Sequence, residues 1–175
     1  IKSRLEDMIN ERKTSRLKRV GSNARVTLLS EGATPSMIDY EEDIPMEDVI
    51  NEEMLDKKIK QMRRAISSNF QAQDAHELAM ILPGRFYDPG SHAMNTQLAM
   101  ALKETDPRLF WSWVKVRSNA EDFEFASIPG LFKRWTKYIN ANTKKTTERL
   151  TIRSIEYWAK TEVPKQYEQL NNRLV

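Results

Sequence analysis

Helical periodicity dominates the chain from residue 45 onward. Apolar residues recur at the spacing of a helix with one buried face, first as Val49, Ile50, Met54, Ile59, Met62 and Ile66. The same periodicity predicts helices over residues 72–82, 91–103, 106–118, 127–139 and 150–160, and a last short helix from Pro164. We therefore predict an all-α fold, a compact bundle of about six helices that occupies residues 47–175.

Capping residues mark where several of these helices begin. Ser91 and Ser127 are suitable N-caps, because a serine hydroxyl accepts a hydrogen bond from a free N–H of the first turn. Asp106 followed by Pro107 is a stronger start signal, since the carboxylate can cap and proline suits the first helical turn. Residues 140–148 are polar and basic, and we predict a loop there.

Residues 1–46 follow a different pattern. Apolar residues form only a thin helical stripe over residues 1–17. The sequence RVTLL at 25–29 suits a short strand. After it, glycine and proline occur among acidic residues. We predict an extended N-terminal arm made of a charged helix and an acidic linker. Because the first residue is isoleucine, we expect the chain to be a piece of a longer protein.

Charge is distributed in blocks, although the net charge is only +3. Residues 1–25 hold eight basic and three acidic residues, residues 31–56 hold ten acidic and no basic ones, and residues 57–64 hold five basic and no acidic ones. Solvated helix faces are the ordinary explanation of such blocks, and pairing with another chain is the alternative. With no apolar run near 20 residues, we expect no membrane span.

Little in the sequence indicates catalysis. Cysteine is absent, which excludes disulfides and cysteine zinc sites and is typical of an intracellular, reducing compartment. The only histidines, His76 and His92, lack the spacing of a metal site, and no glycine-rich phosphate loop occurs. We expect no catalytic residue, metal or cofactor in this fragment, although a triad assembled from distant residues stays open.

Aromatic and basic residues alternate over residues 109–145, a composition that permits binding of single-stranded nucleic acid. Helical geometry separates Trp111 from Trp113, because positions two apart point about 200° apart. Two apolar faces result, and we predict that they pack together in the core: Phe110, Trp113 and Val114 on one, and Phe132, Trp135 and Ile139 on the other. For Trp111, core and surface both remain alternatives.

Basic residues outnumber acidic ones by seven to one between residues 133 and 153. The spacing of Lys133, Arg134 and Lys137 predicts one shared side of a helix. Such a cluster can contact phosphates, and a solvated basic face is an equal alternative. The candidate nucleic-acid-binding residues are Lys133, Arg134, Lys137, Lys144, Lys145, Arg149 and Arg153.

Three segments carry a family resemblance: LAMALKETDPRLFWSWVKVRSNAEDF, LFKRWTKY and LTIRSIEYWAK. They resemble the helical domain that follows the catalytic primase–polymerase module in viral and plasmid replication proteins. The last segment is similar to the linker that leads into the hexameric helicase of poxvirus-type and related large-DNA-virus primase–helicases. The resemblance covers about 80 residues, 81–158, and its pattern is short and aromatic.

The resemblance implies a non-catalytic helical domain that links the primase and helicase modules of a DNA primase–helicase and helps hold single-stranded template DNA. The expected partners are single-stranded DNA, the adjacent primase and helicase modules and, as an option, further copies of the chain. The expected place is intracellular, in the cytoplasm or at a viral replication site. The alternative is an oligomerisation or protein-interaction module, a collar without direct DNA contact.

Overall fold

The computed structural model describes residues 43–139 and 149–174. The chain divides into two units, Ile1–Ile44 and Pro45–Val175. The expected N-terminal helix, the strand at 25–29 and most of the acidic linker lie outside the described residues, as does the predicted loop at 140–148. Every regular element in the described part of the second unit is helical, which confirms the predicted all-α class.

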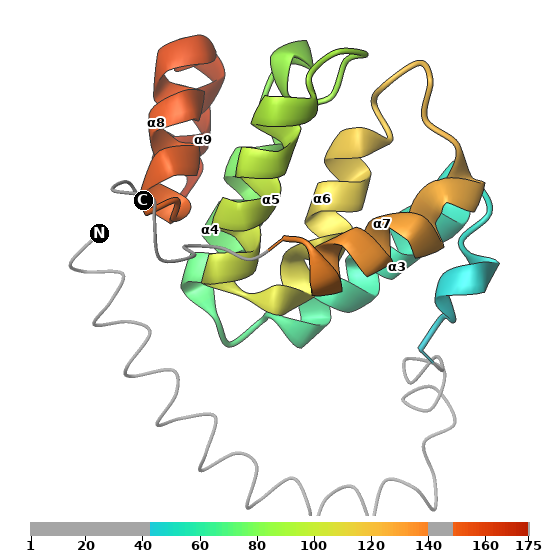
Figure 1. The fold of residues 1–175 in the computed structure, drawn as a ribbon. Helices are drawn as coiled ribbons and strands as arrows, with labels where there is room; N and C mark the ends of the chain where they lie inside the picture. The colour runs from blue at the N-terminus through green and yellow to red at the C-terminus, as the bar shows by residue number, and fades with distance from the viewer. Residues whose placement is uncertain (1–42, 140–148, 175) are drawn as a thin grey trace, which may run out of the picture. The chain divides into compact units, whose positions relative to one another are not determined.

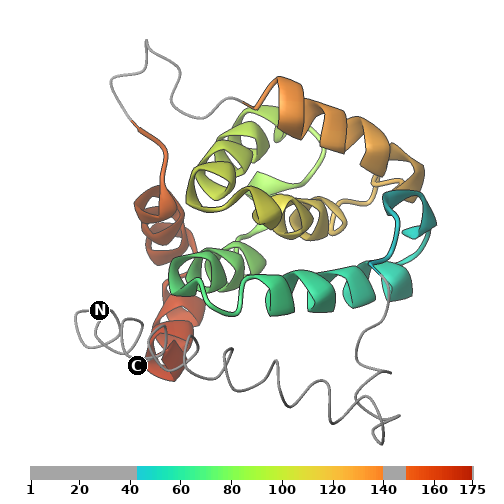
Figure 2. The same ribbon diagram turned by 90° about the horizontal axis from the view of Figure 1, so that it is seen from below.

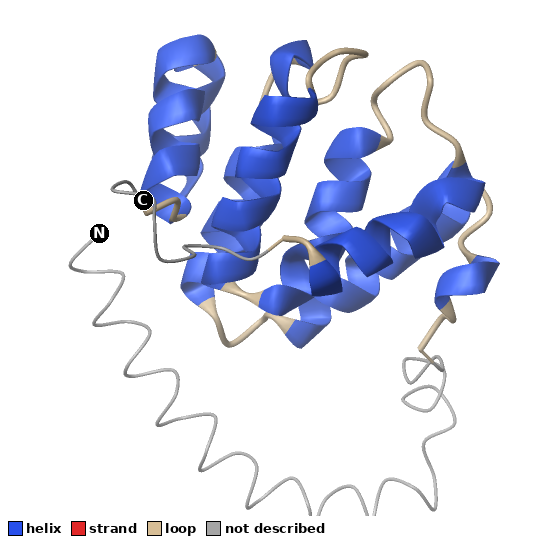
Figure 3. Ribbon diagram, viewed as in Figure 1, coloured by secondary structure: helices blue, strands red, loops and turns tan. Residues whose placement is uncertain are grey.

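The described residues contain seven α-helices and four short 3₁₀ helices, joined by turns and loops. Figures 1 and 3 show their arrangement. Seen from below, α6 is viewed nearly end-on, and α3 and α7 lie on either side of it and run across its axis (Figure 2). The α-helices are α3 (Glu52–Ala65), α4 (Phe70–Met80), α5 (His92–Thr105), α6 (Phe110–Arg117), α7 (Ile128–Lys137), α8 (Ile152–Glu162) and α9 (Pro164–Leu174). The 3₁₀ helices are η1 (Met46–Asp48), η2 (Gly84–Phe86), η3 (Pro107–Leu109) and η4 (Phe125–Ser127).

Side-chain caps begin three of the α-helices. The amide oxygens of Asn51 and Asn69 accept backbone N–H groups at the starts of α3 and α4. Thr151 forms a capping box at the start of α8. The predicted serine caps are at N-cap positions but work differently, because neither Ser91 nor Ser127 accepts a bond from its helix. The hydroxyl of Ser127 donates backwards, to the carbonyl oxygen of residue 124.

A buried carboxylate joins the ends of four helices. The Asp106 carboxylate accepts two hydrogen bonds from Arg108, one from the backbone N–H at 2.8 Å and one from the guanidinium Nη2 at 2.7 Å. It accepts a third from the side-chain amide of Asn69 at 3.1 Å. Arg108 Nη1 donates in turn to the last carbonyl of α3, on Ala65, at 2.5 Å. Burial alone would raise the pKa of Asp106, but the hydrogen bonds and charge of Arg108 and the bond from Asn69 outweigh it and lower the pKa. The carboxylate is therefore charged and fully partnered.

An aromatic cluster fills the core where α6 meets α7. The rings of Trp113 and Trp135 stack with centroids 5.7 Å apart, and Phe110 packs edge-on against both. This contact confirms that the two predicted apolar faces pack together. The Trp113 indole N–H donates to the Asn95 amide oxygen at 2.9 Å, and Asn95 donates to the Phe86 carbonyl at 2.8 Å. Trp113 therefore attaches α6 to both α5 and η2.

Three large apolar residues that the periodicity assigned to the helices are exposed instead. Ile50 is 68% exposed because it lies between η1 and α3, where helical spacing does not apply. Tyr138 is also 68% exposed, because it is the C-cap residue at which the chain leaves α7. Phe132, which was predicted on the core face, is 40% exposed, although its ring contacts Phe110 at a centroid distance of 5.1 Å.

We predict that Trp113→Phe lowers the free energy of unfolding by about 2–4 kcal/mol, because it removes ring volume and leaves the Asn95 amide oxygen unpaired in the core. Urea denaturation measures this change. Trp111→Phe is the matched control, since Trp111 is only half-buried, and we expect less than half the effect. Equal losses in the two variants would contradict the role assigned to Trp113.

Candidate nucleic-acid interface

The outward face of α7 carries two exposed lysines one turn apart. Ile128, Leu131 and Trp135 are buried and hold the inner side of this helix against the bundle. Lys133 and Lys137 point the other way, because they lie about half a turn around the helix from the buried residues. Their charged groups are therefore available to a partner in solution.

Arg134 does not share that face, in contrast to the prediction. Its Nη2 donates to the Thr96 hydroxyl on α5 at 3.2 Å, and its guanidinium lies 5.6 Å from the centroid of the Trp113 ring. Burial, and secondly the charge of Arg117, lower the pKa of Arg134. Adjacent helical residues point about 100° apart, so Arg134 lies on the flank of α7 that faces α5 and α6 and helps to attach the helix.

The last turn of α5 fixes the C-terminal end of α7. Lys103 Nζ donates to the carbonyl oxygens of Trp135 at 2.5 Å and Ile139 at 2.8 Å. A cation at this end satisfies carbonyls that have no partner within the helix and favours the negative end of the helix dipole. Burial lowers the pKa of Lys103. Sequence reasoning missed this residue, because it lies more than 30 positions from the carbonyls that it caps.

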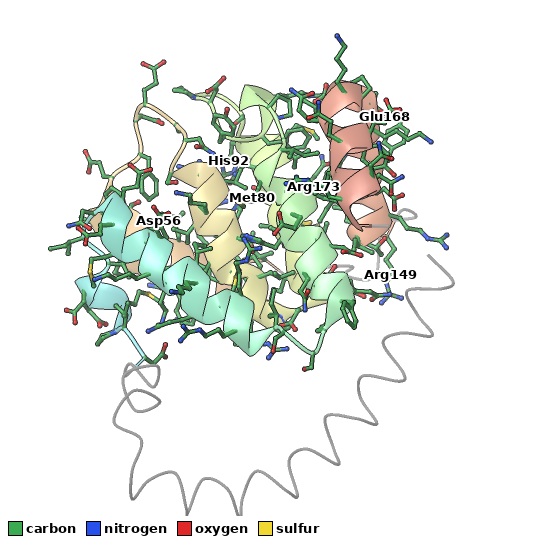
Figure 4. All side chains as sticks on the ribbon, turned by 180° about the vertical axis from the view of Figure 1, so that it is seen from behind. Asp56, Met80, His92, Arg149, Glu168 and Arg173 are labelled. Atoms are coloured by element: carbon green, nitrogen blue, oxygen red, sulfur yellow. The ribbon has the colours of Figure 1, made fainter. Side chains whose placement is uncertain are left out.

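The next residue on α5 holds the start of α8. Glu104 forms an ion pair with Arg149, three residues before that helix. Consecutive residues of α5 therefore bind the end of α7 and the approach to α8, and Figure 4 shows Arg149 near one end of α8. The ion pair also means that Arg149 is already partnered within the chain.

The structure describes five of the seven candidate residues, and Lys144 and Lys145 lie outside the described range. Lys133 and Lys137 share the outward face of α7, and Arg153 is exposed on the first turn of α8. The remaining two, Arg134 and Arg149, make structural contacts inside the chain. Spacing alone could not separate the two groups.

Exposed aromatic rings accompany these basic residues. Tyr138 directly follows Lys137 and is 68% exposed, and Tyr157 on α8 is 66% exposed four residues after Arg153. Neither tyrosine was predicted as a site residue. The outward position of Tyr157 can be read from its helical spacing, whereas that of Tyr138 depends on where α7 ends.

A buried histidine–serine pair is the strongest catalytic alternative, and its burial argues against it. His76 Nδ1 lies 2.8 Å from the Ser112 hydroxyl, which donates to the Met62 sulfur at 3.4 Å. Both residues belong to the core, with His76 only 2% exposed. Burial, and secondly the charge of Arg63, lower the pKa of His76 to about 4. The pair is neutral at pH 7 and out of reach of a substrate.

No protein-family model, curated protein or solved structure matches the chain. Within residues 43–139 and 149–174, no group of three or more histidine, cysteine, aspartate or glutamate side chains is arranged to hold a metal ion. The described helices also include none with the length and apolar character needed to cross a membrane.

We predict that His76 makes folding acid-sensitive. Its pKa is about 6.5 when unfolded and about 4 when folded, so the unfolded chain binds the extra proton and stability falls as pH drops from about 6.5 to about 4. The loss is on the order of 3 kcal/mol, measured by urea denaturation across this range. His76→Gln, which can bond Ser112 without titrating, should show a shallower pH dependence, and an unchanged dependence would contradict the assignment.

Proposed function

We propose that this helical domain binds single-stranded DNA along the outward face of α7 and is a non-catalytic linker between the primase and helicase modules of a replication protein. The observation that carries the proposal is the exposed pair Lys133 and Lys137 on a helix fixed from behind by Trp135 and Lys103. The primase–helicase setting rests on the sequence resemblance alone.

The chemistry of this face suits a single strand. Two ammonium groups one helical turn apart can contact neighbouring phosphates, and each contact releases counterions and makes affinity depend on salt. Tyr138 and the partly exposed Phe132 lie beside Lys137 and Lys133. Their rings can stack on bases that are not paired, which duplex DNA does not offer. Because α7 is held at its inner side and at its C-terminal end, this face needs no refolding to bind.

We predict that replacing both Lys133 and Lys137 with glutamate weakens binding to an oligothymidylate of about 20 nucleotides by tenfold or more at low salt. The slope of log affinity against log salt should also become shallower by about 1.4, because each contact with a single strand contributes about 0.7. Fluorescence anisotropy with the full chain measures both quantities. A control variant, Lys57→Glu with Lys60→Glu on α3, changes the net charge equally, and we expect less than a threefold effect.

Equal weakening by the two charge-reversed variants would assign binding to the overall charge rather than to α7 and would contradict the proposal. Absence of binding by the unaltered chain at low salt would also contradict it. In that case the alternative, an oligomerisation or protein-interaction module, predicts a molecular mass that rises with concentration in light scattering.

A further inference from the structure

A second aromatic and basic surface lies on the outward face of α8. Arg153, Tyr157 and Lys160 occur at positions i, i+4 and i+7, so they share one side of the helix. All three are exposed, and Ile155 and Ala159 on the opposite side are buried. The tyrosine therefore lies at the middle of this face with a cation on either side. We call these three exposed residues the α8 face.

The positive charges of the α8 face are not neutralised by the acids of the same helix. Glu156 accepts the Tyr167 hydroxyl at 2.9 Å, and Glu162 accepts Arg85 Nη1 at 2.9 Å. Both carboxylates are engaged toward neighbouring elements. In the part of the chain that the structure describes, no ion pair involves Arg153 or Lys160.

The α8 face repeats the chemistry of the α7 face. A single exposed tyrosine is ordinary on a protein surface. Here two exposed tyrosines occur in the same setting, Tyr138 beside Lys137 and Tyr157 beside Arg153 and Lys160. An exposed ring beside exposed cations is what single-stranded nucleic acid recognises, with stacking on the ring and phosphate contacts at the cations.

The fold also connects the two faces. Lys103 caps the C-terminal end of α7, and Glu104 holds the approach to α8 through Arg149, so both attach to the last turn of α5. The end of α7 and the approach to α8 thus contact neighbouring residues of α5, so that one strand could reach both faces.

We infer that the α8 face is a second contact for the same single strand of DNA, with Tyr157 stacking on a base and Arg153 and Lys160 contacting phosphates. The inference rests on the proposed function of α7. It extends the path of the strand across two helices and assigns Tyr157 and Lys160 a role in binding. A strand long enough to reach both faces binds more tightly than one that covers α7 alone.

Strand length separates the two contacts experimentally. Fluorescence anisotropy with the full chain compares oligothymidylates of about 6 and about 24 nucleotides, near and above the range that one binding surface covers. We expect Tyr157→Ala to weaken binding of the long strand about tenfold and of the short strand less than twofold. Tyr157→Phe should bind like the unaltered chain, because a phenyl ring stacks as well.

A charge-reversed variant of the α8 face, Arg153→Glu with Lys160→Glu, should reduce the salt dependence of long-strand binding by about 1.4 in slope. Because both positions are exposed, we expect the melting temperature to stay unchanged, and thermal denaturation checks that the variant is folded. If the unaltered chain binds neither strand, the proposed function fails and this inference fails with it.

Two other outcomes overturn only the second contact. In the first, the unaltered chain binds and the α7 variant loses binding, while Tyr157→Ala and the α8 charge reversal change neither strand. In the second, Tyr157→Ala weakens the short and long strands equally, which places Tyr157 in the same contact as α7 rather than in a separate one.

Discussion

The position of α7 depends on the burial of one tryptophan. Trp113 is fully buried, so its indole N–H must find a partner inside the core. Asn95 supplies the acceptor and uses its own amide group on the Phe86 carbonyl, which leaves the network satisfied. An unpaired group at this depth would cost about 1–3 kcal/mol. Trp135 stacks on the Trp113 ring, and this contact sets the rotation of α7 about its own axis.

The rotation of α7 decides which basic residues are structural and which face solvent. With Trp135 turned inward, Arg134 reaches Thr96 and covers the Trp113 ring, whereas Lys133 and Lys137 turn outward. Lys103 is partly buried and donates hydrogen bonds to carbonyl oxygens at the end of the helix. Two cations therefore stabilise the helix, and two remain available on it. A basic cluster in a sequence does not by itself distinguish these two uses.

Helical periodicity predicted most of the fold, because the core positions of α6 and α7 repeat at the spacing of a helix and the Asp106–Pro107 start signal is local. The candidate site was predicted only in part. The inward turn of Arg134, the cap from Lys103 and the ion pair of Glu104 depend on residues far apart in the sequence, which no local pattern shows. Tyr138 was counted with the apolar residues of this helix because the predicted helix runs to residue 139, whereas α7 ends at Lys137 and Tyr138 is its C-cap residue.

The most direct test of the outward face of α7 as a single-strand contact is photo-crosslinking of the full chain to an oligothymidylate carrying 5-bromodeoxyuridine, followed by mass spectrometric mapping. Crosslinks form where a base lies against a side chain, above all an aromatic ring. The account predicts adducts at Tyr138 or Phe132 that disappear at high salt. Adducts confined to residues 1–42 or to α3, with none on α7, would contradict it.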